Sequence, residues 1–312
     1  MLKLTLATIA LVVHAQSFML MAENRPSPNI KLRSHEDNLV GYRKDDNDVA
    51  FMDFKLSLMY PMLHDGELNG SRGKPSFWGP IPYGYFAFTG EFGQYIGSRA
   101  SSPVISKRFN PKLFGRYWLS QEGSYMDISY EHESNGQSID TASAYQRKRL
   151  DLVASGENPA FAQDYISRGW DFLGLTLHKE LAFLHATFAS TFKGKYFLDD
   201  GLLQQAKEEP QAWEGITRAR PRGEYDGLFL KFESNVKFKL GPIRGSKGSF
   251  QLTTGYRSPL KRMSTRVEFL TKWWDFPLVL WGSNGFNNDL ADYYQRVGSY
   301  GVAFELKSFD FL

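Results

Sequence analysis

The stretch from Leu228 to Leu240 constrains the fold most, because apolar and polar side chains alternate along its length. One set of positions is apolar and is interrupted by Ser234 alone: Leu228, Leu230, Phe232, Val236, Phe238 and Leu240. The other set carries most of the charge: Phe229, Lys231, Glu233, Asn235, Lys237 and Lys239. Successive side chains of a β-strand point to opposite faces, so the pattern predicts a strand with one apolar and one charged face. Such a strand is longer than most soluble strands and matches the ~9–11 residues that cross a bilayer at a tilt, with some overhang.

The composition favours a membrane barrel over a helical membrane protein. The chain has 312 residues, of which 42% are hydrophobic and 15% aromatic, yet its mean hydropathy is negative. Beyond the N-terminus, no stretch approaches the ~20 apolar residues that a spanning helix needs. The net charge of +3 is too small to indicate nucleic-acid binding. The absence of cysteine excludes a disulfide scaffold and a cysteine-based zinc site.

About twelve segments have strand-like patterns, and an even number closes a barrel with both termini on one side. They lie near residues 36–43, 50–60, 84–96, 110–119, 124–134, 170–180, 183–193, 226–240, 249–257, 263–273, 276–283 and 294–307. The last of them is followed almost at once by Phe309-Asp310-Phe311-Leu312, which resembles the C-terminal assembly signal of bacterial outer-membrane barrels. We therefore predict an all-β fold, a transmembrane antiparallel β-barrel of about 12 strands.

The N-terminus has the features of an export signal: Lys3, an apolar run over Leu4–Val13, and the small-residue site Val13-His14-Ala15. We expect a signal peptide over residues 1–15, with cleavage possible as late as residue 22. A polar extension over residues 16–35 and a single barrel domain over residues 36–312 would follow.

Three long connections separate the predicted strands, over residues 61–83, 137–169 and 194–225. The second and third contain pieces with helical character, Thr141–Ala154 and Gly201–Lys207.

The most informative short stretch is Tyr130-Glu131-His132-Glu133-Ser134-Asn135-Gly136, at the end of a predicted strand. The alternation places His132 and Ser134 on the apolar, lipid-facing side, with Cα atoms about 6–7 Å apart. A histidine within reach of a serine is the minimum for nucleophilic catalysis. On its own the pattern is weak, because polar residues at strand ends usually contact headgroups, water or neighbouring strands. A histidine facing lipid is nevertheless costly, which favours a functional interpretation.

The motif Tyr-x-His-x-Ser-Asn-Gly at a strand end resembles the active-site motif of the outer membrane phospholipase A family. Further similarity extends over most of the mature chain. It includes Phe54–Pro61, which resembles an early family strand, Ser101-Ser102-Pro103 at the position of a calcium-site loop, and Tyr294–Gly298 before the last strand.

The resemblance implies a calcium-dependent phospholipase of the bacterial outer membrane, with its active site at the outer-leaflet side. It would release fatty acids from phospholipids and lysophospholipids, with Ser134 as nucleophile and His132 as general base. The Gly136 amide would help to hold the oxyanion. Family members are active as homodimers, and calcium would bind oxygen ligands. These ligands would be the Gln137 carbonyl, the Ser167 hydroxyl and Ser101 from the second subunit.

The third catalytic residue depends on where an insertion is placed. The family has Ser-Arg-Ser-Trp-Asn after the catalytic serine. Without a gap, this motif aligns with Ala142–Gln146, and Gln146 takes the place of Asn. With an insertion of about 25 residues, which a surface loop tolerates, the motif aligns with Ser167–Asp171. We prefer Asp171, because Ser167, Arg168 and Trp170 match the family motif and Asp171 shares the lipid-facing parity of Leu173. The catalytic set is then Ser-His-Asp.

Two other interpretations compete with an enzyme of this kind. The chain could be a catalytically inactive barrel, with a porin-like or structural role, although a barrel of about twelve strands has an interior that side chains largely fill. A soluble β-sandwich lipase is disfavoured, because the chain has no Gly-x-Ser-x-Gly motif. Other histidines offer no rival site: His178 and His185 alternate onto the polar faces of their strands, which predicts a lumen network.

Overall fold

The computed structural model describes residues 32–63, 83–97, 104–120, 123–184, 186–203, 221–274 and 276–306. Within these ranges one sheet contains thirteen strands. They are β1 (Arg33–Ser34), β2 (Asn38–Asp45), β3 (Ala50–Leu63), β4 (Tyr83–Tyr95), β5 (Ile105–Trp118), β6 (Tyr125–Ser134), β7 (Gly169–Phe183), β8 (Ala186–Phe197), β9 (Gly227–Leu240), β10 (Ile243–Gly255), β11 (Ser264–Trp273), β12 (Phe276–Gly285) and β13 (Val297–Leu306). The expected signal peptide, Ser101, His185 and the C-terminal aromatic residues lie outside the described residues.

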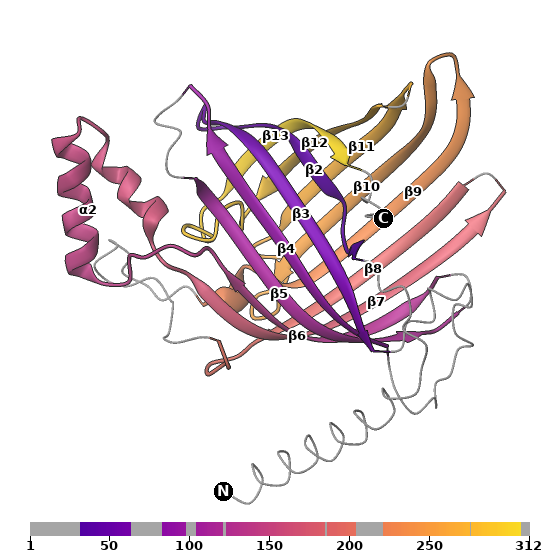
Figure 1. Cartoon of the computed structure of the whole chain (residues 1–312), viewed down its shortest axis with the longest axis horizontal. Helices are drawn as coiled ribbons and strands as arrows, with labels where there is room; N and C mark the ends of the chain where they lie inside the picture. Colours follow the sequence, from indigo (N-terminus) through magenta and orange to yellow (C-terminus); the bar gives the residue numbers. More distant parts are fainter. Residues whose placement is uncertain are drawn as a thin grey trace, which may run out of the picture. The chain divides into compact units, whose positions relative to one another are not determined.

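The strands β2 to β13 close into a 12-strand antiparallel barrel, which confirms the predicted fold. Each strand pairs with its neighbour in sequence, and β13 pairs with β2, from Ser299 opposite Asp45 to Leu306 opposite Asn38 (Figure 1). The two-residue strand β1 lies within the stretch expected to be a polar extension and pairs with β3.

The alternation sorts side chains as expected for a barrel in lipid. Apolar residues of β6 and β7 point outward, and Ile128 is 54% exposed and Leu173 49% exposed. The intervening positions point into the lumen, where they form ion pairs such as the paired contacts of Arg116 with Asp127, both 2.8 Å. The expected lumen position of His178 is borne out by the 2.8 Å contact of its Nδ1 with Thr191 Oγ1.

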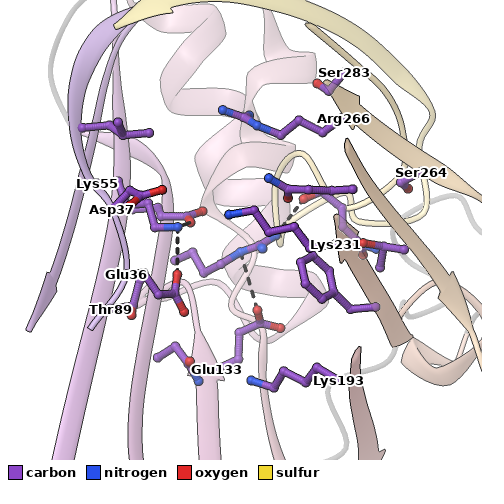
Figure 2. A pocket seen from close by; sticks show the side chains of 18 of the residues that line it. Glu36, Asp37, Lys55, Thr89, Glu133, Lys193, Lys231, Ser264, Arg266 and Ser283 are labelled. Carbon is purple, nitrogen blue, oxygen red and sulfur yellow. Dashed lines mark hydrogen bonds and ion pairs between the residues drawn. The ribbon is translucent and has the colours of Figure 1, made fainter. Parts of the chain in front are cut away.

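Charged side chains surround a lumen cavity of about 640 Å³. Figure 2 shows Lys55, Glu133, Lys193 and Arg266 around it, together with Glu36 and Asp37 from the turn between β1 and β2. Lys55 Nζ lies 2.8 Å from Glu36 Oε2, and Lys247 Nζ 2.9 Å from Asp37 Oδ2. Side chains of this turn therefore link β3 to β10 through ion pairs in the lumen.

The connection between β6 and β7 is helical, as the sequence predicted. It contains α2 (Ala142–Ala154) and the 3-10 helix η1 (Pro159–Tyr165), and a further 3-10 helix, η3 (Arg222–Glu224), precedes β9. Thr141 caps α2 by accepting a hydrogen bond from the Ala144 amide at 3.3 Å. The helix expected over Gly201–Lys207 is absent from its described part, residues 201–203, which are irregular. No helix in the described ranges is both long enough and apolar enough to cross a membrane.

Strand boundaries differ most from expectation at β10, which begins at Ile243 rather than near residue 249. The register shifts between Arg244 and Ser246, and Gly245 has a φ of +67°. A bulge inserts one residue and glycine has no side chain, so the alternation that identifies a strand is lost in this stretch.

Candidate active site

The register between β6 and β7 brings the candidate catalytic residues together. Ser134 lies opposite Gly169, His132 opposite Asp171, and Tyr130 opposite Leu173. Side chains of directly opposed residues on antiparallel strands have Cβ atoms about 4.5–5.5 Å apart. The pairing therefore sets a carboxylate against the imidazole on the lipid-facing side of the barrel.

His132 and Asp171 form a short hydrogen bond, with 2.6 Å between Nδ1 and Oδ1. An ionised carboxylate can only accept, so Nδ1 carries the hydrogen and Nε2 is left as the basic nitrogen. The Asp171 side chain is completely buried, whereas that of His132 is 16% exposed. Asn110 also fixes this position by donating from Nδ2 to the His132 carbonyl oxygen at 3.0 Å.

Ser134 is the last residue of β6 and lies on the same face as His132. No hydrogen bond joins the two side chains in the described part of the chain, although both point outward from neighbouring positions of one face. Catalytic hydrogen bonds are often long without substrate and tighten in the complex.

Asp171 has further partners that the sequence did not predict. The Tyr130 hydroxyl donates to Asp171 Oδ2 at 2.5 Å, and the Leu203 amide donates to the same oxygen at 2.7 Å. Tyr130 could have been found by its parity, since it precedes His132 by two positions on one face. The Leu203 contact comes from a loop and has no local sequence signal.

Gln146, the gap-free alternative to Asp171, lies elsewhere. It is an exposed residue of α2, whereas Asp171 contacts His132 directly. The structure thus brings Asp171, and not Gln146, to the imidazole.

The turn after Ser134 is held by the buried side chain of Asn135. Its Oδ1 accepts from the amides of Arg168, at 2.9 Å, and Gln137, at 3.3 Å, and its Nδ2 donates to the Ile166 carbonyl at 2.7 Å. These bonds tie the chain after β6 to the chain before β7. The candidate calcium ligands Gln137 and Ser167 therefore lie on two segments joined by one side chain.

Gly136 adopts a left-handed conformation, with a φ of +58°. A Cβ at this position would also lie 3.2 Å from the Phe109 ring. Glycine is the residue that meets both conditions without strain, so the candidate oxyanion amide sits in a turn that requires it.

The candidate metal ligands in the described residues are neutral oxygens, the Gln137 carbonyl and the Ser167 hydroxyl. Within the described ranges no cluster of three His, Cys, Asp or Glu residues could hold a metal. The Ser167 hydroxyl makes no hydrogen bond within those ranges. Oxygen donors of this kind fit a hard cation such as calcium, with further ligands needed from elsewhere.

The lumen side of the same strands anchors the site. Arg222 Nη2 donates to Glu133 Oε2 at 2.8 Å and lies 3.1 Å from Asp226 Oδ2. The Arg222 guanidinium also lies over the Trp170 ring, 5.0 Å from its centroid. Residues that alternate with the candidate catalytic groups are thus fixed by buried charge pairs.

Comparisons with known proteins show the fold. No family model and no curated protein sequence matches the chain. Among solved structures, outer membrane phospholipase A from Escherichia coli aligns with a TM-score of 0.54 and 15% identity, over 88% of this chain and 98% of that one. The outer membrane phospholipase of Salmonella typhi, a dimer with bound calcium, aligns with a TM-score of 0.56 and 15% identity, over 93% and 97% of the two chains. At this identity the likeness confirms the resemblance at the level of the fold.

Proposed function

We propose that the protein is a calcium-dependent outer-membrane phospholipase that hydrolyses acyl esters of phospholipids and lysophospholipids. The observation that carries the proposal is the 2.6 Å bond between His132 and a buried Asp171, beside Ser134 on a lipid-facing surface. Ionisable groups that face lipid are rare and mark function. The fold shared with known phospholipases supports the same conclusion.

In the proposed mechanism Ser134 Oγ attacks the ester carbonyl while His132 Nε2 accepts its proton. Asp171 holds the imidazole in the required tautomer and stabilises the imidazolium that forms. The imidazolium then protonates the departing alcohol, and water activated by His132 hydrolyses the acyl-enzyme. The Gly136 amide donates to the developing oxyanion.

Calcium bound by the Gln137 carbonyl, the Ser167 hydroxyl and Ser101 of a second copy would add positive charge near the oxyanion. Because this ligand set draws on two chains, the proposal includes a homodimer as the active form. The exposed apolar side chains on the outer faces of β6 and β7 provide a surface for acyl chains and for a second barrel.

The test is acyl release from mixed phospholipid–detergent micelles by refolded protein, with calcium and with a chelator. The wild-type protein should release fatty acid only with calcium, and Ser134→Ala should release none above background in either condition. Equal release by wild type and Ser134→Ala would refute the proposal and leave a passive barrel as the better interpretation.

A further inference from the structure

A strap of backbone, residues 198–203, lies against the outward-pointing carboxylate of Asp171. The strap continues from β8, and the Leu198 amide donates to the Asp171 carbonyl oxygen at 2.9 Å. The Leu203 amide then donates to Asp171 Oδ2 at 2.7 Å. The Leu202 amide donates to the Tyr130 hydroxyl oxygen at 2.7 Å, and Tyr130 donates its own hydrogen to Oδ2 at 2.5 Å.

These contacts address the main difficulty of a carboxylate at this position, its desolvation. Charged groups directed toward lipid are strongly disfavoured unless hydrogen bonds compensate for lost water. Oδ1 of Asp171 is used by His132, and Oδ2 accepts from the Tyr130 hydroxyl and the Leu203 amide. Hydrogen bonds to an ionised acceptor are about twice as strong as those between neutral groups.

We infer that Tyr130 and the strap are positioning elements that hold Asp171 as a carboxylate and aim it at His132. The inference rests on the proposed function, since the orientation of His132 matters for catalysis only if it acts as the base. Tyr130 and the strap act through Asp171 and are not themselves catalytic.

The strap presents different groups to its two sides. Its amides face the Asp171 carboxylate and the Tyr130 hydroxyl, whereas Leu202 is 86% exposed and Leu203 57% exposed. Gly201 permits the close approach, because a Cβ built there would overlap the Asp171 side chain. The strap thus covers a charge with hydrogen-bond donors and turns leucines outward.

The arrangement requires an aspartate rather than an asparagine. If an amide oxygen kept the bond to His132, the amide nitrogen would occupy the position of Oδ2. That nitrogen is a donor and would face the Leu203 amide, which can only donate. Asp171→Asn, which would give the Ser-His-Asn set of the resembled family, is therefore expected to be harmful in this chain.

The kinetic test uses Tyr130→Phe, which removes the hydroxyl alone, in mixed micelles with saturating calcium. We expect kcat to fall about tenfold, as for the loss of one hydrogen bond to a charged group, with KM unchanged. The acidic limb of the pH–rate profile should move to higher pH, because a less solvated carboxylate draws the shared proton more strongly. Tyr130 and His132 are titratable groups that contact the Asp171 carboxylate. The strap itself contains Asp199 and Asp200, which stay unchanged in every variant.

A double-mutant cycle separates positioning from a structural role. In an Asp171→Asn background, Tyr130→Phe should change kcat less than about twofold, because the carboxylate that the hydroxyl serves is gone. Tyr300→Phe, the same change on the outward face of β13, is the control and should leave rate and pH profile unaltered. Equal effects of Tyr130→Phe in both backgrounds, or wild-type kinetics for the single variant, would overturn the inference.

Hydrogen exchange of residues 199–203 tests the strap without relying on activity. The Leu202 and Leu203 amides should exchange slowly in the wild type and at least about tenfold faster in Asp171→Ala. Gly201→Ala should also speed exchange, whereas Gly194→Ala, where a Cβ meets only ordinary contacts with Phe192, should not. Fast exchange in the wild type would overturn the inference, whereas a slowly exchanging strap in an inactive protein would refute the proposed function alone.

Discussion

Residues on the outward face of β6 differ in the free energy of placing their side chains against lipid. The Ile128 side chain is favourable in lipid. Those of His132 and Ser134 are unfavourable there, because each polar side chain pays a desolvation penalty when it leaves water. Their position is consistent with chemistry on a substrate that reaches the barrel from the bilayer.

Replacement of Ser134 by alanine should lower acyl hydrolysis by about three orders of magnitude or more, because the catalytic residues act as a unit. The heat-modifiable mobility of the folded barrel should persist, since the side chain is at the surface end of a strand. A sulfonyl fluoride should label the wild type at Ser134. Retention of a tenth of the activity by Ser134→Ala would contradict the assignment of the nucleophile.

Asp171→Ala and Gln146→Ala distinguish the two placements of the third catalytic residue. Asp171→Ala should reduce turnover about 10⁴-fold and alter the pH profile between pH 6 and 9, since the imidazolium loses its counter-charge. Gln146→Ala should be silent, because the residue is exposed on α2. The opposite pattern would require the insertion to be placed differently and would remove Ser167 from the calcium site.

At the scale of elements, the loop between β12 and β13 packs against the helical insertion between β6 and β7. Gln163 of η1 donates to the Tyr294 hydroxyl at 2.9 Å. In the same loop, burial, together with the neighbouring Asp289 and Asp164 carboxylates, raises the pKa of Asp292 well above its ordinary value. The ionised form of Asp292 is therefore disfavoured in the folded protein.

The pH dependence of stability follows from that shift. Between the ordinary pKa of an aspartate and the raised value, the folded state holds a proton that the unfolded state has lost, so stability falls as pH rises through this window. Asp292→Asn should raise the urea midpoint in micelles more at pH 7 than at pH 3.5. An equal change at both pH values would show that ionisation of Asp292 does not affect stability.

Strands in which apolar and polar side chains alternate without interruption could be predicted from the sequence. Strand segments interrupted by a bulge could not. The pattern in Leu228–Leu240 identified β9 because every second side chain meets lipid. The start of β10 was missed because a bulge and glycines remove that period. At the site, parity placed Asp171 on the lipid-facing side at the start of its strand, and the structure adds the register that sets it opposite His132. The Leu203 contact arises where a loop returns over the strand, and no local sequence pattern predicts it.

At the scale of the whole molecule, the proposed calcium site is incomplete within one chain. If Ser101 of a second copy completes it, calcium binding and dimerisation must strengthen each other by the same factor. Cross-linking in detergent should give more dimer with calcium and a substrate analogue than with a chelator. A monomer that is fully active in chelator would remove both calcium and the dimer from the proposed function.

The inward ion pairs of β6 have a consequence for how reliably the barrel assembles. Glu131 contacts Lys193, and Glu133 contacts Arg222, from the positions that alternate with His132 and Ser134. A slip of one residue turns every side chain of a strand to the opposite face, so it would send both carboxylates into lipid and both catalytic candidates into the lumen. The lumen pairs therefore favour the native register of β6, because a misregistered β6 would have to place two unpaired charges in the bilayer. Glu131 and Glu133, which do not face lipid, would thus help to determine that His132 and Ser134 do.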